Sequence, residues 1–259
     1  MQNPPGEFYK ILGVKISQLD IRQAVSRVFA WVENRQRVYV CVAPAATIVC
    51  AQDDPEYKKV VNAAAMVTPD GMPVVWLGRW QGRRVQRVYG PDFMRAVIET
   101  GQDQGIRHYF YGGTEQTLRK LTDNIRRDFP RARIAGSWAP EMIKIKEIEK
   151  REILDKINAA DPDILWIGLG SPKQDFWMAA HRGLLSVPVM AGVGAAFDFL
   201  AGVKPQAPRW LQRAGLEWLF RLSCEPRRLG KRYLVGNARF IYFLLRGVLP
   251  KFWGKEKHD

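Results

Sequence analysis

The stretch Asp163-Ile164-Leu165-Trp166-Ile167-Gly168-Leu169-Gly170 is almost continuously apolar and ends in glycine. A run of this kind predicts a strand that is buried on both faces, as in a parallel sheet covered by helices. Ser171-Pro172-Lys173-Gln174-Asp175 follows at once. Ser171 suits a helix cap and Pro172 suits the first helical turn. The stretch therefore predicts one strand-to-helix unit of an α/β protein.

Similar units recur along the first three quarters of the chain. Apolar runs at 38–43, 108–111 and 187–194 predict three further buried strands. Apolar residues spaced three and four apart among charges predict helices at Gln18 to Glu33, Asp54 to Ala65, Gly90 to Gly105, Gln116 to Phe129 and Lys144 to Ala160. This alternation predicts a doubly wound, mostly parallel α/β sheet.

The pattern changes after the last apolar run, where the sequence becomes helical, aromatic and rich in arginine. We predict an α/β domain at 1–205 and a helical appendage at 206–259. Within the appendage, Trp210 and Trp218 are expected to pack as core because they stand at helical spacing. Residues 229–253 are instead expected to contact a membrane, because their aromatic side chains are too many for so small a unit to bury.

Composition limits the classes of partner. The net charge is +14, and the segment 204–259 holds 13 Lys or Arg against four acidic residues. This excess favours phosphate-rich partners such as nucleic acid, anionic lipid or nucleotide diphosphates. Cys41, Cys50 and Cys224 show no metal-ligand spacing and indicate reduced, cytosolic thiols. The sequence has neither a signal-peptide pattern nor a bilayer-length apolar run, so we expect a cytoplasmic protein that lies on the membrane surface.

Candidate ligand-binding segments follow the predicted strands, because open α/β sheets bind ligands beyond the carboxyl ends of their strands. Gly112-Gly113 forms either a plain tight turn or a site that receives a phosphate or ribose at a helix N-terminus. Helix capping accounts for the Ser-Pro pair after the 163–170 run. It does not account for Lys173 and Gln174, which favours a ligand role for Gln174.

The segment Thr68-Pro69-Asp70-Gly71 is the most suggestive of catalysis. Residue preference alone describes a surface turn. The alternative is that Asp70 is a general base, which removes a proton from an acceptor hydroxyl. Asp161-Pro162-Asp163 has the letters of an acidic metal platform, but it precedes a strand and so belongs to the wrong edge of the sheet. Arginine is then expected to neutralise a leaving diphosphate.

Other catalytic patterns are absent from the sequence. His108, His181 and His258 do not form a catalytic set, and no phosphate-binding Walker loop or serine-hydrolase elbow is present.

Two alternative functions stay open. A dinucleotide oxidoreductase would need a Gly-x-Gly-x-x-Gly after the first strand, which Val42-Ala43-Pro44 does not supply. A basic nucleic-acid-binding α/β protein is supported by the charge alone.

Several blocks occur in a fixed order over most of the chain. They are Thr68-Pro69-Asp70-Gly71, Arg87-Val88-Tyr89-Gly90-Pro91-Asp92, Tyr111-Gly112-Gly113, 168–175, 192–199, Ala207-Pro208-Arg209-Trp210, 215–222 and Glu225-Pro226-Arg227-Arg228. From about Ile11 to about Tyr233 the chain thereby resembles the WecG/TagA/CpsF glycosyltransferases, also called glycosyltransferase family 26.

The resemblance implies a Rossmann-like, inverting transferase that needs neither a metal nor another cofactor. The implied donor is a UDP-sugar carrying N-acetylmannosamine or a related hexose or hexosamine. The implied acceptor is a polyprenyl-diphosphate-linked sugar of cell-surface polysaccharide or teichoic acid biosynthesis. The implied location is the anionic inner face of the cytoplasmic membrane. No nucleic-acid partner is implied, and the oligomeric state is left open, a homo-oligomer included.

The resemblance also assigns roles to residues. Asp70 is the implied base, Gln174 and Arg87 are expected to touch donor or acceptor, and Arg221 and Arg228 are expected to hold the diphosphate. The further substrate-binding candidates are Thr68, Gly71, Tyr89, Asp92, Gly112, Gly113, Gly170, Lys173, Gly194 and Asp198.

One departure from the family concerns the donor sugar. Many members carry Thr-x-Asn where this chain reads Val42-Ala43-Pro44, so a polar substrate contact is missing. Thr47 or Gln52 is a candidate to replace it. The identity of the donor sugar is therefore left open.

Overall fold

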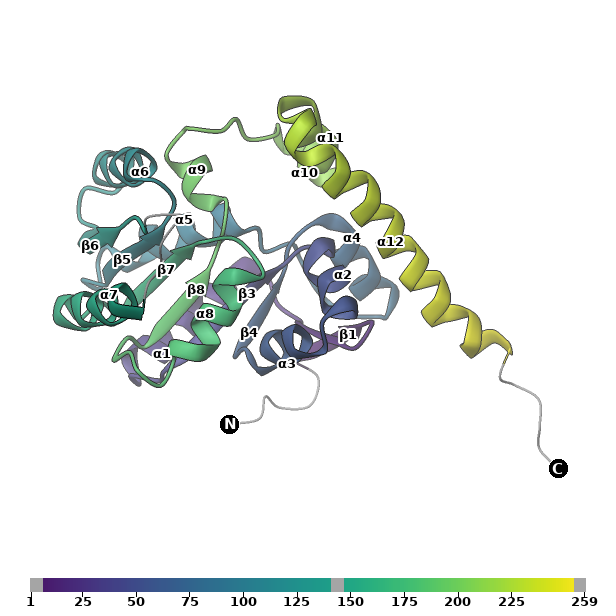
Figure 1. Cartoon of the computed structure of the whole chain (residues 1–259), viewed down its shortest axis with the longest axis horizontal. Helices are drawn as coiled ribbons and strands as arrows, with labels where there is room; N and C mark the ends of the chain where they lie inside the picture. The colour runs from purple at the N-terminus through teal and green to yellow at the C-terminus, as the bar shows by residue number, and fades with distance from the viewer. Residues whose placement is uncertain (1–6, 141–146, 254–259) are drawn as a thin grey trace.

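A computed structural model describes residues 7–140 and 147–253 (Figure 1). Three expectations lie wholly or partly outside these residues: the missing signal peptide, the start of the helix at Lys144, and His258 with the end of the appendage.

The core of the fold is one sheet of six parallel strands in the order β4-β3-β8-β7-β5-β6. The strands are β3 (Val38–Ala43), β4 (Met66–Pro69), β5 (Arg107–Gly112), β6 (Arg133–Trp138), β7 (Ile164–Gly168) and β8 (Val189–Gly192). The predicted Rossmann-like α/β class is confirmed. Because all strands run in the same direction, the loops after them meet at one edge of the sheet.

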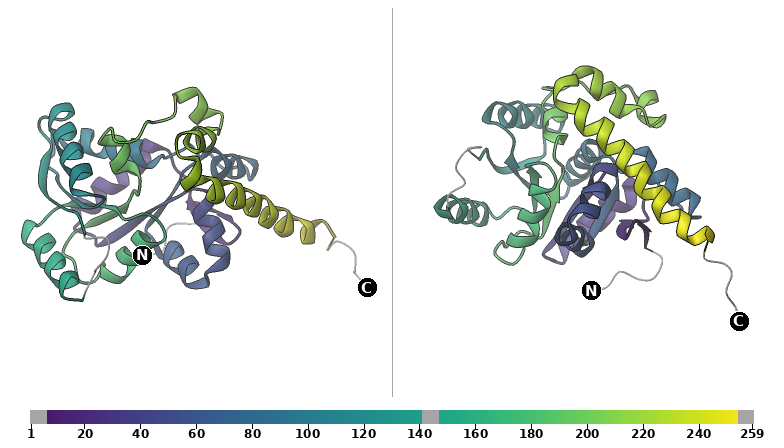
Figure 2. Two further views of the ribbon diagram at one scale, coloured as in Figure 1. Left: turned by 45° about the horizontal axis from the view of Figure 1, so that its top comes forward. Right: turned by 45° about the vertical axis from the view of Figure 1, so that its right-hand side comes forward.

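Helices cover both faces of this sheet (Figures 1 and 2). They are α1 (Ile21–Glu33), α2 (Ala45–Asp53), α3 (Pro55–Ala63), α4 (Met72–Trp80), α5 (Gly90–Gly101), α6 (Glu115–Asp128), α7 (Glu147–Ala160), α8 (Lys173–His181) and α9 (Ala196–Leu200). The strand β7 has a core on each side. Leu165 and Ile167 belong to one buried cluster, and Ile164 and Trp166 belong to the other. Alternate strand residues point to opposite faces, which explains the continuous apolar run.

The strands that were not predicted are short or lie at edges. β4 has only four residues and ends in proline, and the edge strand β6 is only partly buried. A small antiparallel hairpin, β1 (Phe8–Ile11) and β2 (Val14–Ser17), lies next to β4. There the Val67 amide donates to the Ser17 hydroxyl at 3.0 Å. None of these segments forms the long apolar run that identifies a central strand.

Every described element after residue 208 is helical: α10 (Arg209–Arg213), α11 (Glu217–Cys224) and α12 (Pro226–Trp253). The helix α12 packs along α2, and its far end extends beyond the α/β part (Figures 1 and 2). Arg239 of α12 pairs with Asp53 at the end of α2, with Nη1 and Oδ2 2.8 Å apart. Among the described residues, no helix has the length and apolarity of a membrane span.

Two expectations about the C-terminal segment are wrong. Trp210 is 67% exposed, because the short helix α10 turns Gln212 inward and leaves Trp210 outside. Phe240, expected among the membrane-contacting aromatics, is buried where α12 meets the α/β part. Trp218 is partly buried, and its ring centroid lies 6.3 Å from that of Tyr233.

Candidate functional site

Four loops carry the candidate residues to the carboxyl edge of the sheet. Asp70 follows β4, Gly113 follows β5, Gly170 follows β7 and Gly194 follows β8. Parallel strands bring these loops together, although the residues are spread over more than a hundred positions of sequence. The N-termini of α6 and α8 start from the same loops, so their backbone amides point toward this edge. An anionic ligand would find favourable dipoles here.

A cluster of polar side chains, here called the Arg87 cluster, surrounds one guanidinium at this edge. It consists of Asp70, Arg87, Gln212 and Glu217. Arg87 Nη2 lies 3.3 Å from Asp70 Oδ1 and 2.5 Å from Glu217 Oε2, while Nη1 donates to Gln212 Oε1 at 3.3 Å. The side chains of Asp70, Arg87 and Glu217 are 17%, 14% and 13% exposed. The cluster therefore joins the α/β part to α10 and α11.

The electrostatics of the Arg87 cluster favour a proton-accepting carboxylate. Burial raises the pKa of Asp70 to about 6, and the nearby Glu217 carboxylate acts in the same direction. The charges of Arg87 and Arg221 oppose this rise in the pKa of Asp70. A pKa near 6 leaves the carboxylate ionised at neutral pH, yet more basic than an ordinary aspartate. These are the properties of a general base.

Aromatic rings connect Arg87 to a second arginine. The Arg87 guanidinium carbon lies 4.1 Å from the centroid of the Tyr89 ring, and the Tyr89 and Phe199 centroids are 6.2 Å apart. Arg221 of α11 lies on the Phe199 ring, with its guanidinium carbon 5.4 Å from the centroid. Such cation–π contacts hold a guanidinium near a site while its N–H groups stay available to an anion.

The glycines at the carboxyl edge of the sheet differ in why the position is a glycine. Gly112 has a φ of +121°, and a Cβ there would lie 2.6 Å from the backbone of Gly168, so glycine is required for β5 and β7 to pair. Gly170 has a φ of +80°, but a Cβ would meet nothing within 4 Å. Gly113 and Gly194 also adopt positive φ. The space at Gly170 is thus open, whereas the space at Gly112 is filled by protein.

Gln174 is buried beneath these loops. Its Oε1 accepts from the Gly170 amide at 3.0 Å, and its Nε2 donates to the Ser171 hydroxyl at 3.2 Å. A Cβ at Gly192 would lie 2.9 Å from Gln174 Nε2, so the amide also lies against β8. These contacts place Gln174 as a support of the loop after β7, while a direct ligand role stays a prediction. Lys173 beside it is exposed.

Three predicted binding residues are engaged in ion pairs in or near the C-terminal segment. The Asp92 carboxylate accepts hydrogen bonds from both Nη atoms of Arg209, at 2.6 and 3.1 Å. Asp198 lies 2.7 Å from Lys204. Arg228 pairs with Glu225 at the start of α12. The Arg209–Asp92 pair holds α10 beside α5, whereas the Asp198–Lys204 and Arg228–Glu225 pairs are local.

Two further predicted residues lie beside Asp70. Thr68 in β4 is fully buried, and its hydroxyl has no hydrogen-bond partner among the described residues. Gly71 has a φ of +83° and is the N-cap residue of α4, directly after Asp70.

Sequence reasoning missed two members of the Arg87 cluster. Glu217 lies in the 215–222 block, so the block itself was a signal, but Gln212 had none. Gln212 is nevertheless buried, and its Nε2 donates to the Ala207 carbonyl at 2.7 Å.

The aspartates at 161–163 lie at the opposite, amino edge of the sheet, as predicted. Arg107 Nη2 lies 2.6 Å from Asp161, and Arg35 pairs with both Asp161 and Asp163. These ion pairs are structural. Within residues 7–140 and 147–253, no three His, Cys, Asp or Glu side chains gather as metal ligands. His108 is buried, which lowers its pKa to about 4.

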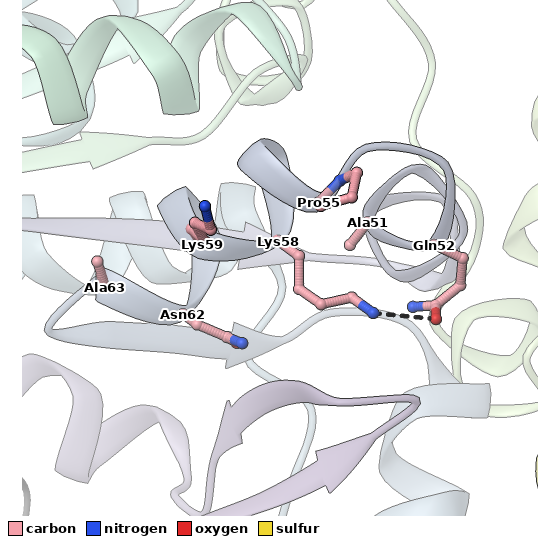
Figure 3. Close-up of a pocket in the computed structure, with 7 residues that line it drawn as sticks. All are labelled: Ala51, Gln52, Pro55, Lys58, Lys59, Asn62 and Ala63. Atoms are coloured by element: carbon pink, nitrogen blue, oxygen red, sulfur yellow. Dashed lines mark hydrogen bonds between the residues drawn. The ribbon is translucent and has the colours of Figure 1, made fainter.

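A hollow of about 510 Å³ lies between α2 and α3 and contains no residue of the Arg87 cluster (Figure 3). Gln52 and Lys58 line it, with Lys58 Nζ 3.2 Å from Gln52 Oε1. Gln52 is the candidate for the missing polar substrate contact, whereas the predicted catalytic and substrate-binding residues do not line this hollow. Gln52 also donates to the carbonyls of Leu12 and Ile48, so its amide already has protein partners.

Comparison with known proteins adds three findings. A family described as "Glycosyl transferase WecG/TagA/CpsF family" matches residues 9–252. An N-acetylglucosaminyldiphosphoundecaprenol N-acetyl-beta-D-mannosaminyltransferase of Bacillus spizizenii is 31% identical over 255 residues, which cover 93% of this chain and 96% of the relative. A Bacillus subtilis protein of the same name is 28% identical over 176 residues, covering 68% of this chain and 67% of the relative.

Proposed function

The chain belongs to the WecG/TagA/CpsF family of glycosyl transferases, and on this premise we propose that it transfers a sugar from a UDP donor to a polyprenyl-diphosphate-linked acceptor with inversion. The names of the two Bacillus relatives support this acceptor class, since each specifies a diphosphoundecaprenol-linked sugar. The family assignment removes the reason to retain the oxidoreductase alternative. The proposed setting is cell-surface polysaccharide or teichoic acid biosynthesis.

The observation that carries this proposal is the position of Asp70 at the carboxyl edge, paired with Arg87 and with a pKa of about 6. In the proposed reaction, the Asp70 carboxylate takes the proton of the acceptor hydroxyl. The acceptor oxygen then bonds to the anomeric carbon of the donor. The bond from that carbon to the β-phosphate oxygen breaks, and its electron pair leaves with UDP. A single displacement of this kind inverts the anomeric configuration.

Fixed cations are proposed to stabilise the leaving diphosphate. Arg221 is placed near the Arg87 cluster by its contact with Phe199, and Arg228 lies at the start of α12. A guanidinium offers two parallel N–H donors to a phosphate, which gives both charge and orientation. Because these residues lie on the C-terminal helices, the docked helices would complete the site.

The loops with Gly113, Gly170 and Gly194 are proposed to bind the UDP moiety. These three glycines adopt positive φ and have no side chain to cover the backbone amides, and Thr114 caps α6 with its hydroxyl. Amides at the start of a helix bind phosphate well. The exposed ammonium of Lys173 at the start of α8 would add a charge at the same edge.

The donor sugar is proposed to be N-acetylmannosamine or a related hexose or hexosamine. The names of the Bacillus relatives support the first, since both specify an N-acetyl-beta-D-mannosaminyl group. Val42-Ala43-Pro44 is a reason to test the donor sugar separately, because Pro44 caps α2 without any side-chain hydrogen bond. A site that lacks one polar contact discriminates differently between sugars.

We also propose that α12 lies on the anionic inner surface of the cytoplasmic membrane. Its exposed apolar residues recur at helical spacing and form a stripe, which consists of Leu234, Val235, Ala238, Ile241, Tyr242 and Leu245. Arg227, Arg228 and Lys231 are exposed near the start of α12, and Arg246 is exposed directly after the stripe. An apolar stripe flanked by cations is typical of helices that lie in the headgroup region.

The test of the function is acceptor-dependent release of UDP. The full chain is incubated with a panel of UDP-sugars, with and without a short-chain polyprenyl-diphosphate-linked N-acetylglucosamine. We expect release from at least one donor only when the acceptor is present, and a product with inverted anomeric configuration. Release that is indifferent to the acceptor would overturn the proposed acceptor class. Turnover abolished by a chelator and restored by a divalent metal would overturn the proposed metal independence.

A further inference from the structure

Glu217 makes the shortest contact in the Arg87 cluster. Arg87 Nη2 faces two carboxylates, Glu217 at 2.5 Å and Asp70 at 3.3 Å. All three side chains are mostly buried, so water screens these contacts weakly. The guanidinium is therefore held closer to Glu217 than to Asp70.

This contact exists only because the C-terminal helices are docked. Glu217 lies in the first turn of α11, 130 positions after Arg87, and Gln212 of α10 holds the other nitrogen of the same guanidinium. The Arg209–Asp92 pair fixes α10 to α5 nearby. Docking of α10 and α11 thus decides how Arg87 is shared between its partners.

The charged groups that face Asp70 come from two directions. Arg87 precedes α5, whereas Arg221 and Glu217 both belong to α11. Glu217 is the anion of this set, and its field opposes that of the two arginines at Asp70. Tyr89, whose ring lies against Arg87, has its pKa raised by burial and stays neutral. Glu217 is thus the group on α11 that favours protonation of Asp70.

We propose that Glu217 is a positioning residue for the transfer reaction. When α11 docks, Glu217 takes the closer contact with Arg87, so the Asp70 carboxylate keeps only the longer contact and is prepared to accept the proton of the acceptor. This inference rests on the proposed role of Asp70 as the base. It assigns Glu217 no contact with the substrates.

Removal of the Glu217 charge would leave Asp70 as the carboxylate partner of Arg87 in this cluster. A carboxylate in an undivided pair with a guanidinium holds its proton less strongly. Its titration would then move to lower pH, and it would be a weaker base on the plateau of the pH profile. Because docking of α11 supplies the Glu217 charge, the basicity of Asp70 would depend on the docked state.

The experiment compares Glu217→Gln and Glu217→Asp with the wild-type full chain. Asp carboxyl carbons are labelled with ¹³C, and the Asp70 signal is assigned with Asp70→Asn. In Glu217→Gln we expect the Asp70 midpoint and the acidic limb of kcat to fall by about one pH unit, with a plateau kcat lowered about tenfold. Glu217→Asp keeps the charge and should recover most of both. Glu56→Gln, an exposed residue paired with Lys59, is the matched control.

An unchanged midpoint and limb in Glu217→Gln would overturn the inference. Circular dichroism checks that each variant is folded, and Glu217→Met is a second neutral variant with a side chain of similar length, read in the same way. The proposed role of Asp70 as the base fails separately, through normal turnover in Asp70→Asn. The proposed transfer reaction fails separately again, through release of UDP that is indifferent to the acceptor. If Asp70→Asn is inactive but the acidic limb of the kcat profile in Glu217→Gln stays at the wild-type pH, only the positioning role of Glu217 is rejected.

Discussion

The carboxylate of Asp70 lies 3.3 Å from the guanidinium of Arg87, and this pair connects the end of β4 to the segment that leads into α5. The two residues are 17 positions apart in sequence. Their contact places a polar pair at the carboxyl edge, where α/β sheets bind ligands. It also separates two interpretations of Thr68-Pro69-Asp70-Gly71, because a simple surface turn would leave Asp70 in water.

Replacement of Asp70 by asparagine tests its role as base. We expect kcat to fall about 10²- to 10⁴-fold, because the amide cannot accept the acceptor proton. Affinity for UDP, measured by calorimetry, should be nearly unchanged. Asp103→Asn, at an exposed site paired with Arg131, is the matched control and should retain full activity. Near-normal turnover in Asp70→Asn would reassign Asp70 to turn geometry.

The pH dependence follows from the raised pKa of Asp70. Since the base must be ionised, the rate should fall as the pH drops through about 6 and level off above it. The pKa is raised, so the loss begins nearer to neutrality than an ordinary aspartate would allow. The measurement is kcat/KM between pH 4.5 and 8. A kcat/KM that stays nearly level down to pH 4.5, as an ordinary aspartate would allow, would contradict the raised pKa of Asp70.

Replacement of Arg221 by alanine tests the proposed diphosphate contact. We expect kcat/KM for the UDP-sugar to fall about 10- to 100-fold, the range for loss of a hydrogen bond between charged groups. Arg213→Ala, in the exposed C-terminal turn of α10, is the matched control. Equal activity of the two variants would remove Arg221 from the site.

The stripe on α12 gives a test of membrane contact that leaves the packing of the helix intact. Ile241→Asp combined with Leu245→Asp should weaken binding to phosphatidylglycerol vesicles about tenfold or more, because two apolar side chains no longer leave water. Leu184→Asp, at an exposed apolar site after α8, is the control. Truncation of the chain at Gly230 would be a less specific test, because it would also remove the contacts of Arg239 and Phe240 with the α/β part. Unchanged flotation of the double variant would contradict the assignment.

Two glycines of the edge should respond differently to alanine. Gly112→Ala places a Cβ 2.6 Å from the backbone of Gly168, so β5 and β7 must separate. The expected loss is about 3 kcal/mol or more, from overpacking plus backbone strain. Gly170→Ala has only the positive-φ strain, about 1–2 kcal/mol. Thermal denaturation measures both, and equal losses would contradict the close packing at Gly112.

The central part of the fold was predictable because its signal is local. The run 163–170 and its counterparts are buried on both faces, so apolar side chains follow one another without interruption. The strands β4 and β6 escaped prediction since one is very short and the other lies at an edge. Asp70, Arg87 and Gln174 were proposed for the site from their blocks, and the structure brings Asp70 and Arg87 into contact. Gln212 was missed because its contact with Arg87 spans 125 positions.

The sequence by itself determined that the strands are parallel and that their carboxyl-end loops share an edge, because strand and helix periods are properties of consecutive residues. Only the tertiary structure decided that Glu217 competes with Asp70 for one guanidinium. It alone also showed that Trp210 faces water, and which side of α12 is covered by α2. These contacts depend on the surface against which each helix packs. Helical periodicity shows which face of a helix is apolar, but it does not show what that face packs against.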